Sequence, residues 1–166
     1  MSGMDRRIIT LISASVLLLA IVVVVVVAGG GSDDESGGKV SDNLEERPVI
    51  EASDDPPPTE LESNDIVVGD GAEAKTGDSV SVQYAGALYD TGQEFDASWD
   101  RGEPFDFDLG TSSVIKGWDE GIQGMKVGGR RELIIPPDLA YGEPGQPPTI
   151  PPNATLVFVV DLLEVK

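Results

Sequence analysis

The sequence contains no cysteine and no histidine. Without these residues the chain has no disulfide framework, no thiol nucleophile, no histidine base and no Cys/His zinc site. We therefore expect a protein that uses neither a metal nor another cofactor. Any chemistry must rely on carboxylates, hydroxyls, aromatic rings and the backbone.

Positive charge is also scarce. The chain has 11 Lys and Arg residues against 30 Asp and Glu residues, which gives a net charge of −19 at pH 7. A chain of this charge is repelled by nucleic-acid phosphates and by anionic lipid headgroups. We therefore exclude nucleic acid as a partner.

Large apolar residues are concentrated in one run, residues 8–28. These 21 residues carry no charge, and as a helix they would be about 32 Å long, close to the roughly 30 Å of a bilayer core. Arg6 and Arg7 precede the run and acidic residues follow at positions 33–35, so the positive-inside rule places residues 1–7 in the cytoplasm. The sequence predicts a single-pass membrane anchor, with everything after Gly29 outside the cytoplasm.

A cleavable signal peptide is the alternative interpretation of the same run. The basic start fits a signal peptide, and Ala28 supplies a small residue near a cleavage point. The apolar run is, however, longer than the roughly 7 to 15 residues of a typical signal core. We favour a retained anchor, while cleavage would give a secreted protein. Both interpretations place the remaining chain outside the cytoplasm.

Residues 29–58 differ in composition from the chain on either side. They are rich in Gly, Ser, Asp, Glu and Pro and contain few large apolar side chains. Such a segment cannot bury enough apolar surface to offset the entropy lost on ordering. We predict an acidic, flexible linker with a reach of about 30 Å, which separates the anchor from a folded domain at residues 59–166.

The folded domain shows the alternation of short antiparallel strands. Val80, Val82 and Tyr84 fall on one face of a predicted strand, as do the apolar residues of positions 105–109. Further strands are predicted at residues 130–135 and 155–165. Turns that contain glycine separate these segments, and no internal repeat is visible.

One segment has the spacing of a helix. Ile115, Trp118 and Ile122 recur at intervals of three and four residues, and Ser112 or Ser113 is placed to cap the helix. Its glycines lower the intrinsic helix propensity, so the helix must depend on packing against the sheet. The adjacent acidic pair at positions 119 and 120 is interpreted as solvated helix surface. One short helix on an antiparallel sheet predicts an α+β fold.

Several motifs occur in the order and spacing of one known family. They are VVGDG at residues 67–71, YAG at 84–86, GQEFD at 92–96, GWDEG at 117–121, MKVG at 125–128, IPP at 135–137, AYG at 140–142 and IPPNATLVF at 150–158. Residues 59–166, but none of the chain before them, therefore resemble the FKBP-type peptidyl-prolyl cis–trans isomerases. The resemblance implies a curved antiparallel sheet half-wrapped around the helix, with a cleft for proline-containing polypeptides. It also implies macrolides as possible inhibitors, and we expect a monomer.

The resemblance assigns site residues position by position. Candidate catalytic residues are Asp96, Tyr84, Phe95, Trp118, Tyr141 and Phe158, with Trp118 as the pocket floor. Candidate substrate-binding residues are Phe105, Val114, Ile115, Arg101, Gln146, Thr149 and Ile150. In the family pattern Arg101 occupies a supporting position that pairs with the region of the Asp96 carboxylate.

The chain departs from the family pattern at two rim positions. Gln146 stands where many relatives carry histidine, and Thr149 stands where an apolar residue is common. The resemblance therefore implies a pocket with a more polar rim. We predict catalysis of prolyl isomerisation in proteins that fold outside the membrane, by desolvation and transition-state binding in an aromatic pocket. The alternative, which the polar rim motivates, is recruitment of proline segments by a tethered domain with weak turnover.

Overall fold

The computed structural model describes residues 40–166, which lie within one compact unit, Asp34–Lys166. The predicted cytoplasmic segment and the predicted anchor at residues 8–28 lie outside the described residues. Between residues 40 and 166 there is no helix that is both long and apolar enough to cross a membrane.

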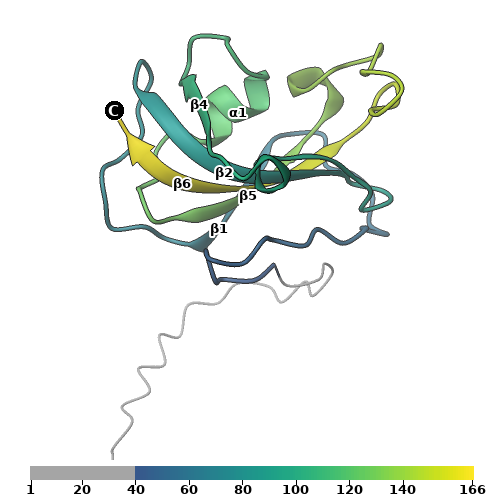
Figure 1. The fold of residues 1–166 in the computed structure, drawn as a ribbon. Coiled ribbons are helices and arrows are strands. Elements are labelled where there is room, and N and C mark those ends of the chain that lie inside the picture. Colours follow the sequence, from purple (N-terminus) through teal and green to yellow (C-terminus); the bar gives the residue numbers. More distant parts are fainter. Residues whose placement is uncertain (1–39) are drawn as a thin grey trace, which may run out of the picture. The chain divides into compact units, whose positions relative to one another are not determined.

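A six-stranded antiparallel sheet forms the body of the domain (Figure 1). Its strands are β1 (Glu62–Val67), β2 (Ser79–Leu88), β3 (Glu94–Ala97), β4 (Phe105–Asp108), β5 (Arg130–Ile135) and β6 (Leu156–Val165). The order is β1-β5-β6-β2-β3, and β4 also pairs with β2. With one short helix, α1 (Lys116–Gly121), and two 3₁₀ turns, η1 (Ser98–Arg101) and η2 (Pro137–Leu139), this confirms the predicted α+β fold.

The inner face of the sheet packs on α1 and forms the core. In β2, Val80, Val82 and Tyr84 are all buried, as the alternation predicts. Positions 82 and 84 of β2 pair with Leu162 and Val160 of β6, and these side chains join the same core. The sheet and helix together therefore enclose one continuous apolar layer.

Helix α1 approaches β5 closely because two of its residues are glycines. A Cβ atom at Gly117 would lie 2.4 Å from Ile135 Cγ2, and one at Gly121 would lie 2.6 Å from Leu133 Cδ2. The glycines that weaken the helix in isolation are thus the residues that let it reach the sheet. This contact, rather than propensity, stabilises α1.

Replacing Gly117 by alanine should lower the free energy of unfolding by about 1 to 3 kcal/mol, because the added methyl group overpacks the helix–sheet contact. The measurement is urea denaturation of residues 34–166. Glu120→Ala, at an exposed position of the same helix, is the control and should stay near wild type. An equally stable Gly117→Ala variant would contradict the close contact.

The predicted serine cap of α1 is wrong. The helix begins at Lys116 with Ile115 as its N-cap, and no side chain caps it. Instead, the carboxylate of Asp119 accepts hydrogen bonds from the backbone N–H groups of Gly110 (2.8 Å) and Ser112 (2.9 Å). Asp119 is therefore not merely solvated surface, because it holds the loop before the helix.

Residues 40–58, which we name the strap, run along the outer face of the sheet, opposite α1 (Figure 1). The buried Arg130 side chain donates hydrogen bonds to the carbonyls of Ser41 (2.6 Å), Asn43 (3.1 Å) and Glu46 (2.9 Å). Farther along, the N–H of Ser53 donates to the Tyr89 carbonyl at 3.0 Å. The described part of the predicted flexible linker is thus attached to the domain.

The outer face of the sheet explains why the strap is ordered. Ala85, Ala87, Val157 and Val159 point away from the main core, yet none of them is more than 5% exposed. The sheet supplies the apolar surface that the strap lacks, and Arg130 supplies donors for its carbonyls. Composition alone missed both contributions.

Candidate active site

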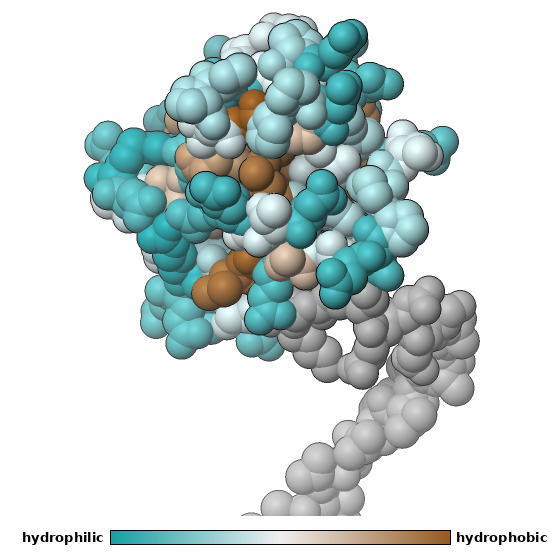
Figure 2. Space-filling view, turned by 90° about the vertical axis from the view of Figure 1, so that its right-hand side faces the viewer, coloured by the Kyte–Doolittle hydropathy of each residue, from teal (hydrophilic) through white to brown (hydrophobic). Residues whose placement is uncertain are grey.

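A cavity of about 540 Å³ opens at one side of the domain. It is lined by Tyr84, Phe95, Asp96, Phe105, Ser113, Val114, Ile115, Trp118, Tyr141, Gln146, Pro147, Thr149, Ile150 and Phe158. Figure 2 looks at the side of the molecule that carries the loop after β5, where apolar surface gathers amid mostly hydrophilic surface. All the predicted site residues except Arg101 line this cavity.

Trp118 forms the floor of the cavity. Its side chain is 4% exposed, and its ring lies 5.0 Å from Tyr84 and 5.2 Å from Phe158, with interplanar angles of 83° and 85°. The indole Nε1 is buried and has no hydrogen-bond partner among residues 40–166. Such edge-to-face packing fixes the ring orientation, so the floor is an apolar surface of defined shape.

Gly86 permits the aromatic wall beside this floor. A Cβ at Gly86 would lie 2.6 Å from Phe158 Cε1 and 2.9 Å from Phe95 Cζ. Because the position has no side chain, the rings of Phe95 and Phe158 pack at 5.5 Å with an interplanar angle of 84°. The YAG motif thus supplies both a site tyrosine and the space for two phenylalanines.

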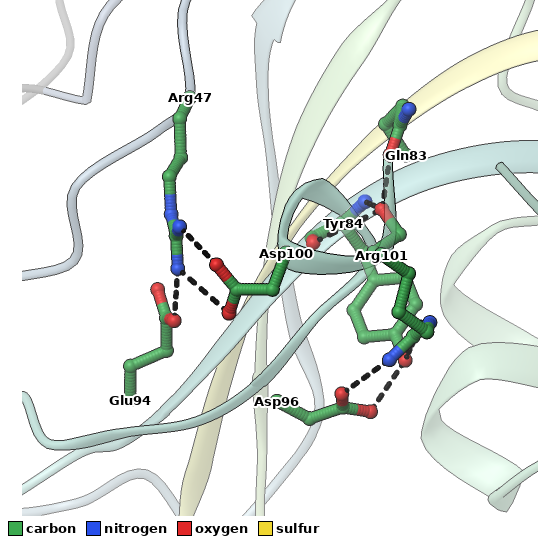
Figure 3. A network of polar contacts seen from close by, with 8 residues as sticks. Arg47, Gln83, Tyr84, Glu94, Asp96, Asp100 and Arg101 are labelled. Atoms are coloured by element: carbon green, nitrogen blue, oxygen red, sulfur yellow. Dashed lines mark hydrogen bonds and ion pairs between the residues drawn. The ribbon is translucent and has the colours of Figure 1, made fainter. Parts of the chain in front are cut away.

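Asp96, Arg101 and Tyr84 form a closed polar network at the cavity edge (Figure 3). The Tyr84 hydroxyl donates to Asp96 Oδ2 at 2.5 Å, while Arg101 donates to Asp96 Oδ1 at 2.8 Å and to the Tyr84 hydroxyl at 2.8 Å. The pairing of Arg101 with Asp96 is as the resemblance implies. Arg101 does not line the cavity but contacts two residues that do.

The electrostatics of the cavity keep both tyrosines protonated. Burial, and then the hydrogen bond to Asp96, raise the pKa of Tyr84 to about 12. Burial also raises the pKa of Tyr141, with a smaller contribution from the Asp96 charge. Each phenol is therefore a neutral hydrogen-bond donor at physiological pH.

The rim carries the two residues that depart from the family pattern. Gln146 and Thr149 are exposed on the loop after η2, and the backbones of Gln146 and Ile150 exchange hydrogen bonds of 2.8 and 2.9 Å. The structure adds two lining residues that the sequence reasoning missed, Ser113 and Pro147. Each is next to a predicted site residue in the sequence, and this adjacency is the only sequence feature that could have indicated them.

A metal centre is not among the features of the described chain. Within residues 40–166, no group of three or more Asp or Glu residues is arranged to hold a metal ion. The cavity offers aromatic surface, one carboxylate and hydroxyl donors. Such a site can bind, desolvate and orient a ligand.

Comparison with known proteins shows which family the chain matches. Residues 71–163 match the family FKBP-type peptidyl-prolyl cis-trans isomerase. The FK506-binding protein of Streptomyces anulatus is 54% identical over 121 residues, which cover 72% of this chain and 98% of that protein. The peptidyl-prolyl cis-trans isomerase FPR2 of Saccharomyces cerevisiae is 54% identical over 94 residues, covering 57% of this chain and 70% of the yeast protein.

Solved structures show the same fold. The crystal structure of AtFKBP13 matches with a TM-score of 0.61 and 40% identity, covering 66% of this chain and 96% of that one. The crystal structure of FkpA from Escherichia coli matches with a TM-score of 0.59 and 51% identity, covering 65% of this chain and 49% of that one.

The similarity begins before the predicted domain start. The Streptomyces relative aligns over 121 residues of sequence and 72% of this chain, which is more than residues 59–166 contain. The similarity to the family therefore extends beyond the predicted range, residues 59–166. Part of the segment before Thr59 has a counterpart in a relative that is matched over almost its whole length.

Proposed function

The chain belongs to the family of FKBP-type peptidyl-prolyl cis–trans isomerases and is an enzyme of that class, and we propose that it works by desolvating X-Pro bonds in proteins that fold outside the cytoplasmic membrane. The observation that carries the mechanism is the open cavity whose aromatic walls converge on Trp118. A proline ring is an apolar ligand that such walls accommodate. The polar groups stand at the edge, where they meet the neighbouring peptide units.

Rotation about an X-Pro amide requires no covalent bond to break. The barrier of about 18 to 20 kcal/mol arises from the partial double bond of the planar amide. Twisting removes the charge separation between oxygen and nitrogen, so the transition state is less polar than the ground state. A pocket that excludes water therefore favours the twisted amide by differential binding.

Two groups are placed to orient the substrate. The Tyr141 hydroxyl, which remains protonated, can donate to a peptide carbonyl beside the proline. Ile115 lines the cavity at the N-cap of α1, where the first N–H groups of a helix lack intrahelical partners. We assign these two positions to carbonyl binding and the aromatic residues to the proline ring.

Relatives named for FK506 binding motivate a ligand as well as a substrate. The Streptomyces anulatus and Corynebacterium glutamicum proteins are an FK506-binding protein and a probable FK506-binding protein. We propose that this cavity also takes macrolides, with an affinity reduced by its polar rim at Gln146 and Thr149. Competition between FK506 and a prolyl peptide tests this directly.

The mechanism predicts activity that is nearly independent of pH. The chain has no histidine, Tyr84 has a pKa of about 12 and the Tyr141 pKa is also raised, so both phenols stay protonated near neutrality. We expect kcat/KM to vary by less than about twofold from pH 6 to 9, because no proton is transferred. NMR exchange of an X-Pro peptide measures this without a coupling protease. A bell-shaped profile would contradict it.

The direct test of function is a protease-coupled isomerisation assay with an Ala-Leu-Pro-Phe peptide. Catalysis well above the spontaneous rate, inhibited by a competing prolyl peptide, supports the proposal. A folded protein that binds proline peptides but leaves their isomerisation at the spontaneous rate would instead act as a recruiter. The exposed polar residues of the rim, Gln146 and Thr149, are the feature that favours this second function.

The proposed setting rests on the sequence of residues 1–35. A single membrane anchor with a cytoplasmic amino terminus would hold the domain outside the membrane. The test is protease accessibility in cells that express the full chain and whose cell wall has been removed. Protease added outside these cells should digest the domain. Protection of the domain would contradict this topology, and the mass of the mature chain distinguishes a retained anchor from a cleaved signal peptide.

A further inference from the structure

An arginine of the strap contacts the site strand from outside the cavity. Arg47 Nη1 lies 2.6 Å from Asp100 Oδ1, its Nη2 lies 3.3 Å from Asp100 Oδ2, and its Nη2 also pairs with Glu94 Oε1. Glu94 is the first residue of β3 and Asp100 lies in η1. Arg47 therefore bridges the two ends of the segment that carries Phe95 and Asp96.

Figure 3 shows this segment between two arginines. Arg47 meets Glu94 and Asp100, while the adjacent Arg101 meets Asp96 at the cavity edge. Because Asp100 and Arg101 are neighbours in one short turn, a shift of the first displaces the second. The strap is thereby connected to the polar network of the site.

Strand β3 has few ladder hydrogen bonds, although the turn that follows it is held by the buried Ser98, whose hydroxyl accepts from the Tyr84 N–H at 2.8 Å. The strand has four residues, lies at an edge of the sheet and pairs only with β2, and the β2–β3 ladder shifts register between Gly86 and Ala87 of β2. An edge strand with a bulge makes few ladder hydrogen bonds. Side-chain contacts must therefore supply part of what fixes the direction of Phe95 and Asp96.

Arg47, in contrast, is attached to a firm base. Arg130 holds the carbonyl of the preceding residue, Glu46, at 2.9 Å, and its own charge pairs with the buried Asp161 at 2.6 Å. The following residue, Pro48, is buried and has a fixed φ. The arginine thus extends from an anchored part of the strap to a short edge strand.

We propose that Arg47 is a positioning residue of the isomerase site, which holds β3 and η1 so that Asp96 and Phe95 keep their places; this role rests on the isomerase function proposed above. The Arg47, Glu94 and Asp100 side chains are 39%, 35% and 62% exposed. Pairs of this exposure are screened by salt. The effect of Arg47 on turnover is accordingly moderate and sensitive to ionic strength.

The test uses the full chain in detergent micelles. Arg47→Ala should lower kcat/KM about three- to tenfold, chiefly through kcat, because misplaced catalytic groups affect the transition state. Arg47→Lys should recover only part of the activity, since an ammonium cannot reproduce the two-pronged contact with Asp100. Raising NaCl to about 1 M should lower kcat/KM by a larger factor in wild type than in Arg47→Ala, because the exposed Arg101–Asp96 pair is screened in both while the Arg47 pairs exist only in wild type.

Two further variants isolate the contact. Asp100→Asn should reproduce part of the loss, because it leaves the Arg47–Glu94 pair in place. Combining it with Arg47→Ala should cost little more than Arg47→Ala alone, because Arg47→Ala already removes the Asp100 contact. Asp65→Asn is the matched control. The Asp65 side chain is 41% exposed and pairs with Arg131 at the opposite edge of the sheet, and the substitution removes this ion pair. That control should keep wild-type kcat/KM.

The outcomes separate the two proposals. A wild-type chain that does not exceed the spontaneous rate overturns the isomerase function itself. An active wild type with an equally active Arg47→Ala variant overturns the positioning role alone. The same holds if Arg47→Ala lowers only the denaturation midpoint, or if Asp65→Asn loses as much activity, because the effect is then structural or belongs to surface charge in general.

Discussion

Replacing Asp96 by valine is expected to lower kcat/KM about 10- to 100-fold. Valine is shorter and has no polar side-chain atom, so it cannot accept the hydrogen bonds that Tyr84 and Arg101 donate to the carboxylate. Both donors then lose their orientation at the cavity edge, and displacement of site groups has effects of this size. A 100-fold loss corresponds to about 2.7 kcal/mol of transition-state stabilisation. A protease-coupled assay on residues 34–166 measures it.

Binding distinguishes an organising carboxylate from a binding one. The Kd of a prolyl peptide should change less than kcat/KM in Asp96→Val, whereas Trp118→Ala should weaken binding and turnover together because it removes the floor. Asp106→Asn is the control, since this carboxylate pairs with Lys166 instead of the pocket groups. Equal losses of binding and turnover in Asp96→Val would favour the recruiter function.

Replacing Asp161 by asparagine is expected to lower the free energy of unfolding by about 3 to 5 kcal/mol. Arg130 and Asp161 are 0% and 1% exposed and share two hydrogen bonds of 2.6 and 2.7 Å. Removing one charge leaves the other buried without its counter-ion. Because a domain of this size is stable by only about 5 to 15 kcal/mol, guanidinium denaturation of residues 34–166 should show the loss clearly.

Two variants test the source of this loss. Glu164→Gln removes an exposed carboxylate from the same strand and should leave unfolding near wild type. The double variant Arg130→Met with Asp161→Leu removes both charges, which by itself is often tolerated. Here it should still be destabilising, because the strap carbonyls lose their donors. Full recovery of stability in the double variant would show that Arg130 does not hold the strap.

Most of the candidate site could be predicted because its residues lie in motifs with fixed spacing. Tyr84, Asp96, Trp118 and Phe158 belong to four separate motifs of the family pattern, and the fold brings all four to one cavity. Three of these four residues are aromatic, and their residue types within the motifs made the site predictable. Ser113 and Pro147 were missed because their residue types are common in loops and their backbone geometry alone brings them to the cavity.

The strands with strict alternation were also predictable. β5 occupies the predicted residues, and β6 begins one residue later than predicted. β1 was not predicted, because its sequence is mostly polar and four of its six residues are exposed. The helix cap failed for a different reason: the helix begins only at Lys116, and the Ser113 hydroxyl instead donates to the Asp108 carbonyl at 3.0 Å.

By itself the sequence determined the fold class, the family and the aromatic site, because apolar alternation and spaced motifs are local properties of the chain. Only the tertiary structure decided that the described part of the acidic segment is a strap. Its order comes from partners far along the chain: Arg130 donates to its carbonyls, and Arg47 reaches Glu94 and Asp100. Such contacts join residues separated by tens of positions, and no local pattern records them.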